Sequence, residues 1–331
     1  MIPWERVLQD FQKFTARQLQ DFGEFPSQEY TFLIQSVPYA AYHGVEHLDS
    51  TVIALGPSCD VFGSLYTELL GVCSHELYHS WNIKALRPVE MQPYNFKNEN
   101  YAQTGLIYEG ITTYLGDLYL LKSGVFSTEL YLKELSKQVQ KHIDNPGRFS
   151  MSVAAASFDT WLDGYVPGAP GRKVSIYTEG CLLAFYVDYR LRKATKNKVG
   201  IEQVMKTLYF NFGVVKKGYT LADYQTTIEN LAGDFGAKAW IGGCWSSPQY
   251  RGVGHSAGRA QGPALPDRQR GVRRHRRLRS LLAHGSCARA RWLQRDAPAR
   301  RAVRAGAGVG RFRVGRCGGA AGRGRMSGHV I

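Results

Sequence analysis

Hydrophobic residues follow two different spacings in the first part of the chain. From Trp4 to Phe22 they recur every three or four positions, which predicts an amphipathic helix over residues 3–22. Residues 30–37 and 51–55 are runs of branched and aromatic side chains, which are typical of strands. We therefore expect the chain to begin with a helix that covers a small sheet.

Helical spacing dominates the sequence that follows, as far as residue 233. It predicts a long helix over 62–83 and a second one over 101–122. A small sheet followed by a mostly helical part defines an α+β domain. The remaining helices are expected over 127–143, 178–195, 201–211 and 220–233.

The periodic pattern stops near Trp240, where the composition changes. Of the 42 basic and 27 acidic residues in the chain, 20 arginines and 2 acids lie in 251–331, which leaves 22 basic and 25 acidic residues for 1–250. The body is therefore slightly acidic, although the whole chain has a net charge of +15. We expect a folded domain over 1–240 and a disordered Arg/Gly/Ala-rich tail over 241–331.

Two explanations of this tail stay open. Arginine runs such as 273–277 would neutralise phosphates, as in a nucleic-acid-binding arm. Alternatively, a frameshift in a GC-rich gene would exchange Lys, Asn and Tyr for Arg, Gly, Ala and Pro, as happens here. The frameshift is favoured, so nucleic acid is not the partner that we expect.

The use of cysteine and the hydropathy of the chain indicate a compartment. The six cysteines are scattered singly, without the spacing of a zinc knuckle or a disulfide framework. This pattern favours a reducing environment, and we expect a cytoplasmic protein. The sequence has no run of about 18 apolar residues, so we expect no membrane span.

The most informative short motif is His75-Glu76-Leu77-Tyr78-His79, inside the predicted helix 62–83. Residues four apart lie on one face of a helix, so His75 and His79 can hold one metal ion, and zinc is the expected metal. Glu76 can take a proton from a metal-bound water that attacks a carbonyl carbon. The motif therefore predicts hydrolysis of a peptide bond.

A catalytic zinc site needs a third protein ligand, and two acids follow the motif. Glu99 comes twenty residues after His79, in surroundings typical of a loop. Glu109 comes thirty residues after His79, in the predicted helix 101–122, which would hold a ligand more rigidly. We favour Glu109.

Several separated motifs together resemble the glycyl aminopeptidase family of gluzincin metallopeptidases. The resemblance extends from about residue 3 to residue 236, and it is carried by segments 75–88, 108–114, 44–47 and 177–180. It implies a thermolysin-like catalytic domain with a zinc ion. The implied ligands are His75, His79 and Glu109, and the implied general base is Glu76.

The resemblance also implies roles for residues outside the metal motif. Tyr177 begins a segment similar to one in the related aminopeptidase N family, whose tyrosine donates a hydrogen bond to the oxyanion. Glu46, with Gly44 beside it, resembles an edge-strand motif that binds the free amine of a substrate. Structural roles stay open for both: a core tyrosine at a helix start, and a surface charge on a strand.

Three further residues could be mistaken for metal ligands or could support them. His43 and His47 are not at helical spacing, so we expect them to line the substrate site or to be merely polar. Asp117, eight residues after Glu109, either orients a ligand or is a solvated charge.

The sequence thus predicts a zinc aminopeptidase that removes N-terminal residues, Gly or Ala by resemblance, from peptides with a free N-terminus. Two alternatives are a thermolysin-type endopeptidase and an inactive fragment or basic-tailed nucleic-acid binder. The family usually has a β-rich domain before the catalytic domain and a PDZ-like domain after it. Neither is recognisable in this sequence, so we expect a truncated catalytic domain whose activity is open.

Overall fold

The structure begins with the helix and sheet that the hydrophobic pattern predicts. The computed structural model describes residues 2–163, 169–233, 309–315 and 327–330. Phe11 and Phe14 of the first helix pack edge-on against Phe32, with ring centroids 5.0 and 6.3 Å apart, so the helix covers the sheet. The elements are helix α1 (Trp4–Phe22) and strands β1 (Glu29–Ser36), β2 (Ala41–Glu46) and β3 (Ser50–Gly56).

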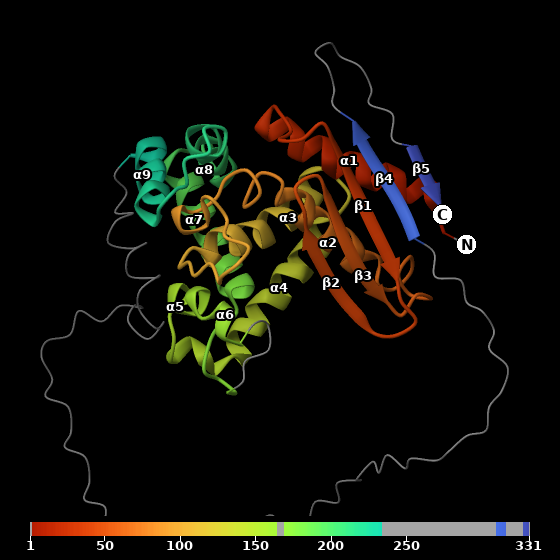
Figure 1. Ribbon diagram of the computed structural model, residues 1–331, viewed down its shortest axis with the longest axis horizontal. Helices are drawn as coiled ribbons and strands as arrows, with labels where there is room; N and C mark the ends of the chain where they lie inside the picture. The colour runs from red at the N-terminus through yellow and green to blue at the C-terminus, as the bar shows by residue number, and fades with distance from the viewer. Residues whose placement is uncertain (1, 164–168, 234–308, 316–326, 331) are drawn as a thin grey trace, which may run out of the picture. The chain divides into compact units, whose positions relative to one another are not determined.

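The sheet is mixed, with the strand order β2-β3-β1-β4-β5 (Figure 1). Strand β3 runs parallel to β1 and antiparallel to β2, and this register places Gly44 opposite Ile53. Strands β4 (Val309–Gly315) and β5 (Ser327–Val330) continue the sheet beyond β1 in antiparallel pairing. Within the described sheet β2 is therefore an edge strand. Most of segment 241–331 lies outside the described residues, so the division of the chain at 240 stays a prediction.

Helices form most of the rest, which confirms the predicted α+β class. The helices expected after residue 126 are present, but two short ones, α5 and α6, follow α4 without having been predicted. None of the described helices is long and apolar enough to cross a bilayer. The α-helices after the sheet are α2 (Tyr66–Tyr78), α3 (Thr112–Lys122), α4 (Thr128–Asp144), α5 (Val153–Phe158), α6 (Thr160–Asp163), α7 (Ile176–Ala194), α8 (Ile201–Leu208) and α9 (Leu221–Ala232).

The two long predicted helices need correction. Helix 62–83 is too long as predicted, because α2 ends at Tyr78 and the chain turns at Ile83, whose φ of +107° is rare for a β-branched residue. Helix 101–122 starts too early as predicted, because residues 101–104 are not helical. It opens instead with a π-helix, η2 (Leu106–Ile111), which leads directly into α3.

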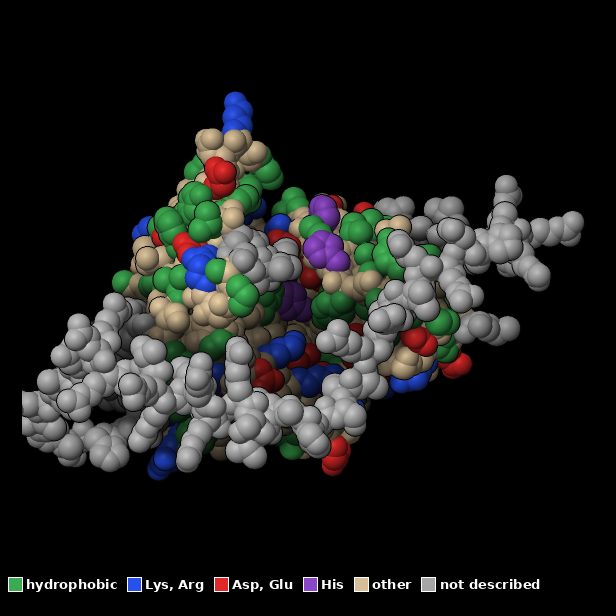
Figure 2. All heavy atoms as spheres, turned by 90° about the horizontal axis from the view of Figure 1, so that it is seen from below, with side chains coloured by type: hydrophobic (Ala, Val, Ile, Leu, Met, Phe, Trp, Pro, Cys, Tyr) green, Lys and Arg blue, Asp and Glu red, His purple; other side chains and the backbone are tan. Residues whose placement is uncertain are grey.

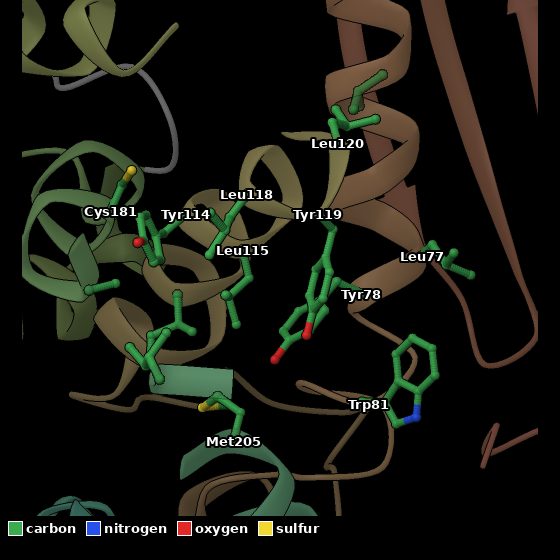
Figure 3. Close-up of a cluster of buried hydrophobic side chains, with 14 of the residues drawn as sticks. Leu77, Tyr78, Trp81, Tyr114, Leu115, Leu118, Tyr119, Leu120, Cys181 and Met205 are labelled. Carbon is green, nitrogen blue, oxygen red and sulfur yellow. The ribbon is translucent and has the colours of Figure 1, made fainter. Parts of the chain in front are cut away.

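The core holds α2 on several sides. The rings of Tyr78 on α2 and Tyr119 on α3 lie side by side, with centroids 5.8 Å apart (Figure 3). Trp81 stacks on Phe22 of α1, with centroids 4.6 Å apart and planes 6° from parallel. The indole N–H of Trp81 donates to the backbone oxygen of Glu24 over 3.0 Å. Helix α2 and the turn after it are therefore fixed by aromatic packing.

Two glycines let α7 cross the π-helix η2 in backbone contact. A Cβ added at Gly180 of α7 would lie 2.6 Å from Cα of Gly110 and 2.9 Å from the carbonyl oxygen of Leu106. Such distances are too short for carbon, and backbone atoms cannot swing away. The contact fixes η2 against the first turns of α7.

We predict that Gly180→Ala destabilises the protein. In a helix interior, alanine is more favourable than glycine by about 1 kcal/mol of helix propensity. Overpacking against backbone costs more than this gain, so the free energy of unfolding should fall by about 2 kcal/mol. Urea denaturation of the full chain measures this change. The control is Gly63→Ala, where the nearest atom to a new Cβ is 3.7 Å away, so stability should stay within about 0.5 kcal/mol. Equal stabilities would contradict the close crossing.

Candidate active site

Three side chains from two helices converge on one point. His75 lies in the last turn of α2, His79 caps that helix, and Glu109 comes from η2. The Nε2 atoms of the two histidines are 3.0 Å apart, and each is 3.3 Å from Oε2 of Glu109. The structure thus brings together the three predicted ligands in a group that could hold a metal ion.

The surroundings of these three residues fit a metal. Nδ1 of His79 lies 2.9 Å from the backbone oxygen of Asn82, which can only accept, so Nδ1 carries the proton and, in the neutral ring, the Nε2 lone pair faces Glu109. Oε2 of Glu109 is buried and, apart from its contacts with the two imidazoles, has no hydrogen-bond partner within the part of the chain that the structure describes. Two imidazoles and a carboxylate suit a divalent transition metal.

The electrostatics of the group also favour a cation. Burial raises the pKa of Glu109, but His79 and His75 outweigh burial and lower it to about 2. Burial lowers the pKa of His79, but Glu109, Glu46 and Glu76 together raise it to about 10. Without a metal, the carboxylates therefore hold a proton on the imidazole. A bound cation would replace that proton, so metal affinity should weaken as the pH falls.

Glu76 lies beside the metal group and is 5 % exposed. The hydroxyl of Tyr30 donates to its backbone oxygen over 3.0 Å, which ties this turn of α2 to strand β1. Burial raises the pKa of the Glu76 carboxyl group, with His75 and His79 opposing. A carboxyl group whose pKa is raised above its ordinary value takes up a proton more readily, which suits general acid–base work.

Gly44 of β2 faces Glu76 at very short range. A Cβ added at Gly44 would lie 2.2 Å from Oε1 of Glu76 and 2.9 Å from a methyl group of Val72. Any side chain at this position would therefore displace the Glu76 carboxylate. The structure gives Gly44, which we expected to bind substrate, a steric reason to lack a side chain.

Glu46 at the end of β2 also lies close to Glu76. Its carboxylate belongs to a second group, with Glu76 and His79, whose ligand atoms lie within 4.8 Å of one another. The Nζ atom of Lys84 is 3.2 Å from Oε1 of Glu46. Burial raises the pKa of Glu46, but His79 and Lys84 outweigh it and lower the pKa, so the group is anionic. The sequence did not reveal Lys84 as a partner of Glu46, because the two residues are far apart in the chain and no local pattern links them.

A cleft of about 830 Å³ contains these side chains. Tyr177, in the first turn of α7, lines the cleft, and its ring centroid is 6.2 Å from that of His75. His43 and Asp117 also line it. Burial and the nearby Glu134 raise the pKa of Asp117 to about 7, although His75 opposes them. Figure 2 shows histidine side chains gathered around a hollow on one face of the molecule.

Two of the candidate residues lie apart from the metal group. Glu99 is exposed, in the non-helical segment before η2, and belongs to neither group of ligands. His47 is exposed, and its Nδ1 lies 3.1 Å from the backbone oxygen of Val45. The geometry therefore favours Glu109 over Glu99 as the third ligand.

Two comparisons with known proteins found similar sequences or structures. Residues 68–183, which contain the metal group and Tyr177, match the sequence model of the M61 glycyl aminopeptidase family. The crystal structure of an aminopeptidase N family protein from Idiomarina loihiensis is similar, with a TM-score of 0.67 and 30 % sequence identity. The match covers 75 % of this chain and 43 % of that one, so the chain spans less than half the length of this relative. No curated protein matches the chain.

The matched segment carries the metal group and the crossing of η2 with α7, and the shared fold extends over most of the chain. Residues 68–183 are therefore similar to the glycyl aminopeptidase family, and most of the chain has a fold like that of an aminopeptidase N family protein.

Proposed function

We propose that this chain is the catalytic part of a zinc-dependent aminopeptidase, which hydrolyses the first peptide bond of substrates with a free N-terminus. The observation that carries the proposal is the convergence of His75, His79 and Glu109 beside Glu76 at the wall of one cleft. The family match supports peptides as the substrate class. Gly or Ala as the preferred first residue is the part of the proposal that rests on the family alone.

The residues present suit zinc as the metal. His75, His79 and Glu109 would hold it, in the two-histidine, one-glutamate set of catalytic zinc sites. When bound, zinc supplies a Lewis acid that polarises the peptide carbonyl group and makes water more acidic.

Glu76 is the group that moves the proton. Its buried carboxylate would take a proton from the attacking water and deliver it to the leaving amine. Because Gly44 has no side chain, strand β2 leaves room for the Glu76 carboxylate at its observed position. Because Oε2 of Glu76 has no partner among the described residues, no competing hydrogen bond is seen there.

Tyr177 and Glu46 would act on the substrate itself. Tyr177 lies on the cleft wall near His75, where a phenol O–H can donate to the oxygen that gains negative charge during attack. Glu46 is anionic and close to Glu76, where it can receive the substrate ammonium group. An ammonium group on Glu46 would place the first peptide bond next to Glu76, which explains removal of one residue at a time.

One observation favours a second candidate, an endopeptidase of thermolysin type. Glu46 already has a cation, because Nζ of Lys84 lies 3.2 Å away. If Lys84 stays in place, Glu46 is neutralised and does not select a free amine. Peptides would then be cut internally by the same Glu76 chemistry.

We predict that Glu76→Gln abolishes most activity while the metal stays bound. The amide keeps the shape of the carboxylate but cannot accept the proton, so kcat should fall by about 10²–10⁴-fold. Hydrolysis of Gly- and Ala-peptides by the full chain, with zinc content measured in parallel, tests this. Glu99→Gln is the matched control, because Glu99 is exposed and apart from the metal group. An unchanged kcat in Glu76→Gln would exclude Glu76 as the base.

We also predict that the free amine is recognised by Glu46. The full chain should cleave a peptide with a free N-terminus and spare its N-acetylated form. Glu46→Gln should reduce this preference about 10-fold or more, because the charge-assisted hydrogen bond between the carboxylate and the substrate ammonium group is lost. Lys84→Met is the matched control: it removes the competing cation and keeps Glu46, so KM for the free peptide should not rise. Equal cleavage of free and acetylated peptides by the unchanged protein would favour the endopeptidase instead.

A further inference from the structure

The π-helix that carries Glu109 is held by side chains from outside it. In η2 the hydrogen-bond ladder shifts from i+4 to i+5, which leaves carbonyl groups in need of other donors. The amide nitrogen Nδ2 of Asn82 donates to the carbonyl oxygen of Ile107 over 3.0 Å. The hydroxyl of Thr112 donates to the carbonyl oxygen of Tyr108 over 2.7 Å. These carbonyl groups come directly before Glu109, so the two bonds fix the turn that aims its carboxylate.

Asn82 reaches both halves of the metal group. Its backbone oxygen lies 2.9 Å from Nδ1 of His79, and its side chain contacts η2 and also donates to the hydroxyl oxygen of Thr112 over 3.0 Å. The residue is completely buried. One residue therefore joins the histidine side of the group to the glutamate side.

The backbone after Asn82 is held in an unfavourable conformation. Ile83 has a φ of +107°, in the left-handed region that a β-branched residue rarely adopts. The guanidinium Nε of Arg87 donates to the carbonyl oxygen of Ile83 over 3.1 Å, and the N–H of Ile83 donates to the carbonyl oxygen of Leu86 over 3.1 Å. Strain of this kind persists only where neighbouring contacts impose it, and here it accompanies an Asn82 that faces His79 and η2 together.

We propose that Asn82 is a positioning residue, which sets the distance and orientation of Glu109 relative to His79 and so determines the metal affinity of the site. This inference rests on the proposed metal site of His75, His79 and Glu109. Asn82 would not touch the metal or the substrate. Its side chain would act through the turn of η2 that presents Glu109, while its backbone oxygen fixes the tautomer of His79 whatever residue stands at this position.

The test measures metal binding by the full chain, with Asn82→Ala and Asn82→Asp as variants. Both variants keep the backbone oxygen that faces His79 and change only the side-chain bonds to η2 and Thr112, so we expect Kd for Co²⁺ and Zn²⁺ to rise by about 10-fold, the lower end of the range for outer partners of metal ligands. The visible absorption of bound Co²⁺ should also change, because it reports the geometry of the ligands. A purely structural role would lower the unfolding temperature and leave the Co²⁺ spectrum of the folded protein as it was.

Asn100→Ala is the matched control. Asn100 is also a buried asparagine, and its Nδ2 donates to the backbone oxygens of Asn95 and Asn98 over 2.7 and 3.0 Å, in a loop apart from the metal group. This variant should lose stability but keep the Kd and the spectrum of Co²⁺. Both measurements are made at a temperature at which every variant is folded.

Thr112→Val tests the hydrogen bond between Asn82 and Thr112 by removing its acceptor. This variant tests the positioning role of Asn82 even if both Asn82 variants fail to fold. It removes the hydroxyl that accepts from Asn82 and donates to Tyr108, so we expect a smaller loss of Co²⁺ affinity, several-fold, with a spectral change in the same direction. Unchanged Kd and spectrum in the folded variants would overturn the role of Asn82 and leave the metal site standing. If the unchanged protein binds no Co²⁺ or Zn²⁺, the metal site is wrong, and the role of Asn82 falls with it.

Discussion

Burial of the Glu109 carboxylate between two imidazoles is the constraint on which the rest of this structure depends. An ionised carboxylate cannot leave water without a cation or donors to replace it, and among the residues that the structure describes His75 and His79 are the side chains that contact Oε2. The two histidines come from α2 and the glutamate from η2, so these two segments must stay fixed at a distance of a few ångströms. Close packing around the site helps to meet that requirement.

The helices meet this requirement through contacts that allow almost no adjustment. Gly110 and Gly180 bring the backbones of η2 and α7 together, and a Cβ at Gly116 of α3 would lie 3.2 Å from Cα of His75 in α2. Strand β2 approaches from the opposite side, where Gly44 meets Glu76. Backbone thus approaches the site closely at these glycines, and because backbone moves less than side chains do, the reacting groups need little reorganisation.

Sequence patterns predicted those parts of the molecule whose signals are local. Helix α1 and strands β1 and β3 follow their hydrophobic spacing closely, and His75, Glu76 and His79 lie within one short motif. Helix 62–83 was predicted too long because apolar residues continue past Tyr78, while the chain turns at Ile83, where Ile83 bonds to Leu86 and the neighbouring Asn82 bonds to η2. The π-helix, and the partners of Lys84 and Asn82, could not be predicted, since those partners come from segments distant in the sequence. The roles of the site residues stay predictions.

The π-helical turn has a consequence for how the site can change. An α-helix advances by about 100° per residue, and a π-helical turn takes up about one residue more than an α-helical turn. Removal of one residue from Leu106–Ile111 would let the segment relax to an α-helix without rotating α3, whose buried face would keep its packing. The position of Glu109 would rotate away from the histidines, and Gly110 would shift from its contact with Gly180. The extra residue of the π-helix therefore sets both the direction of a metal ligand and the fit of a helix crossing within one short segment.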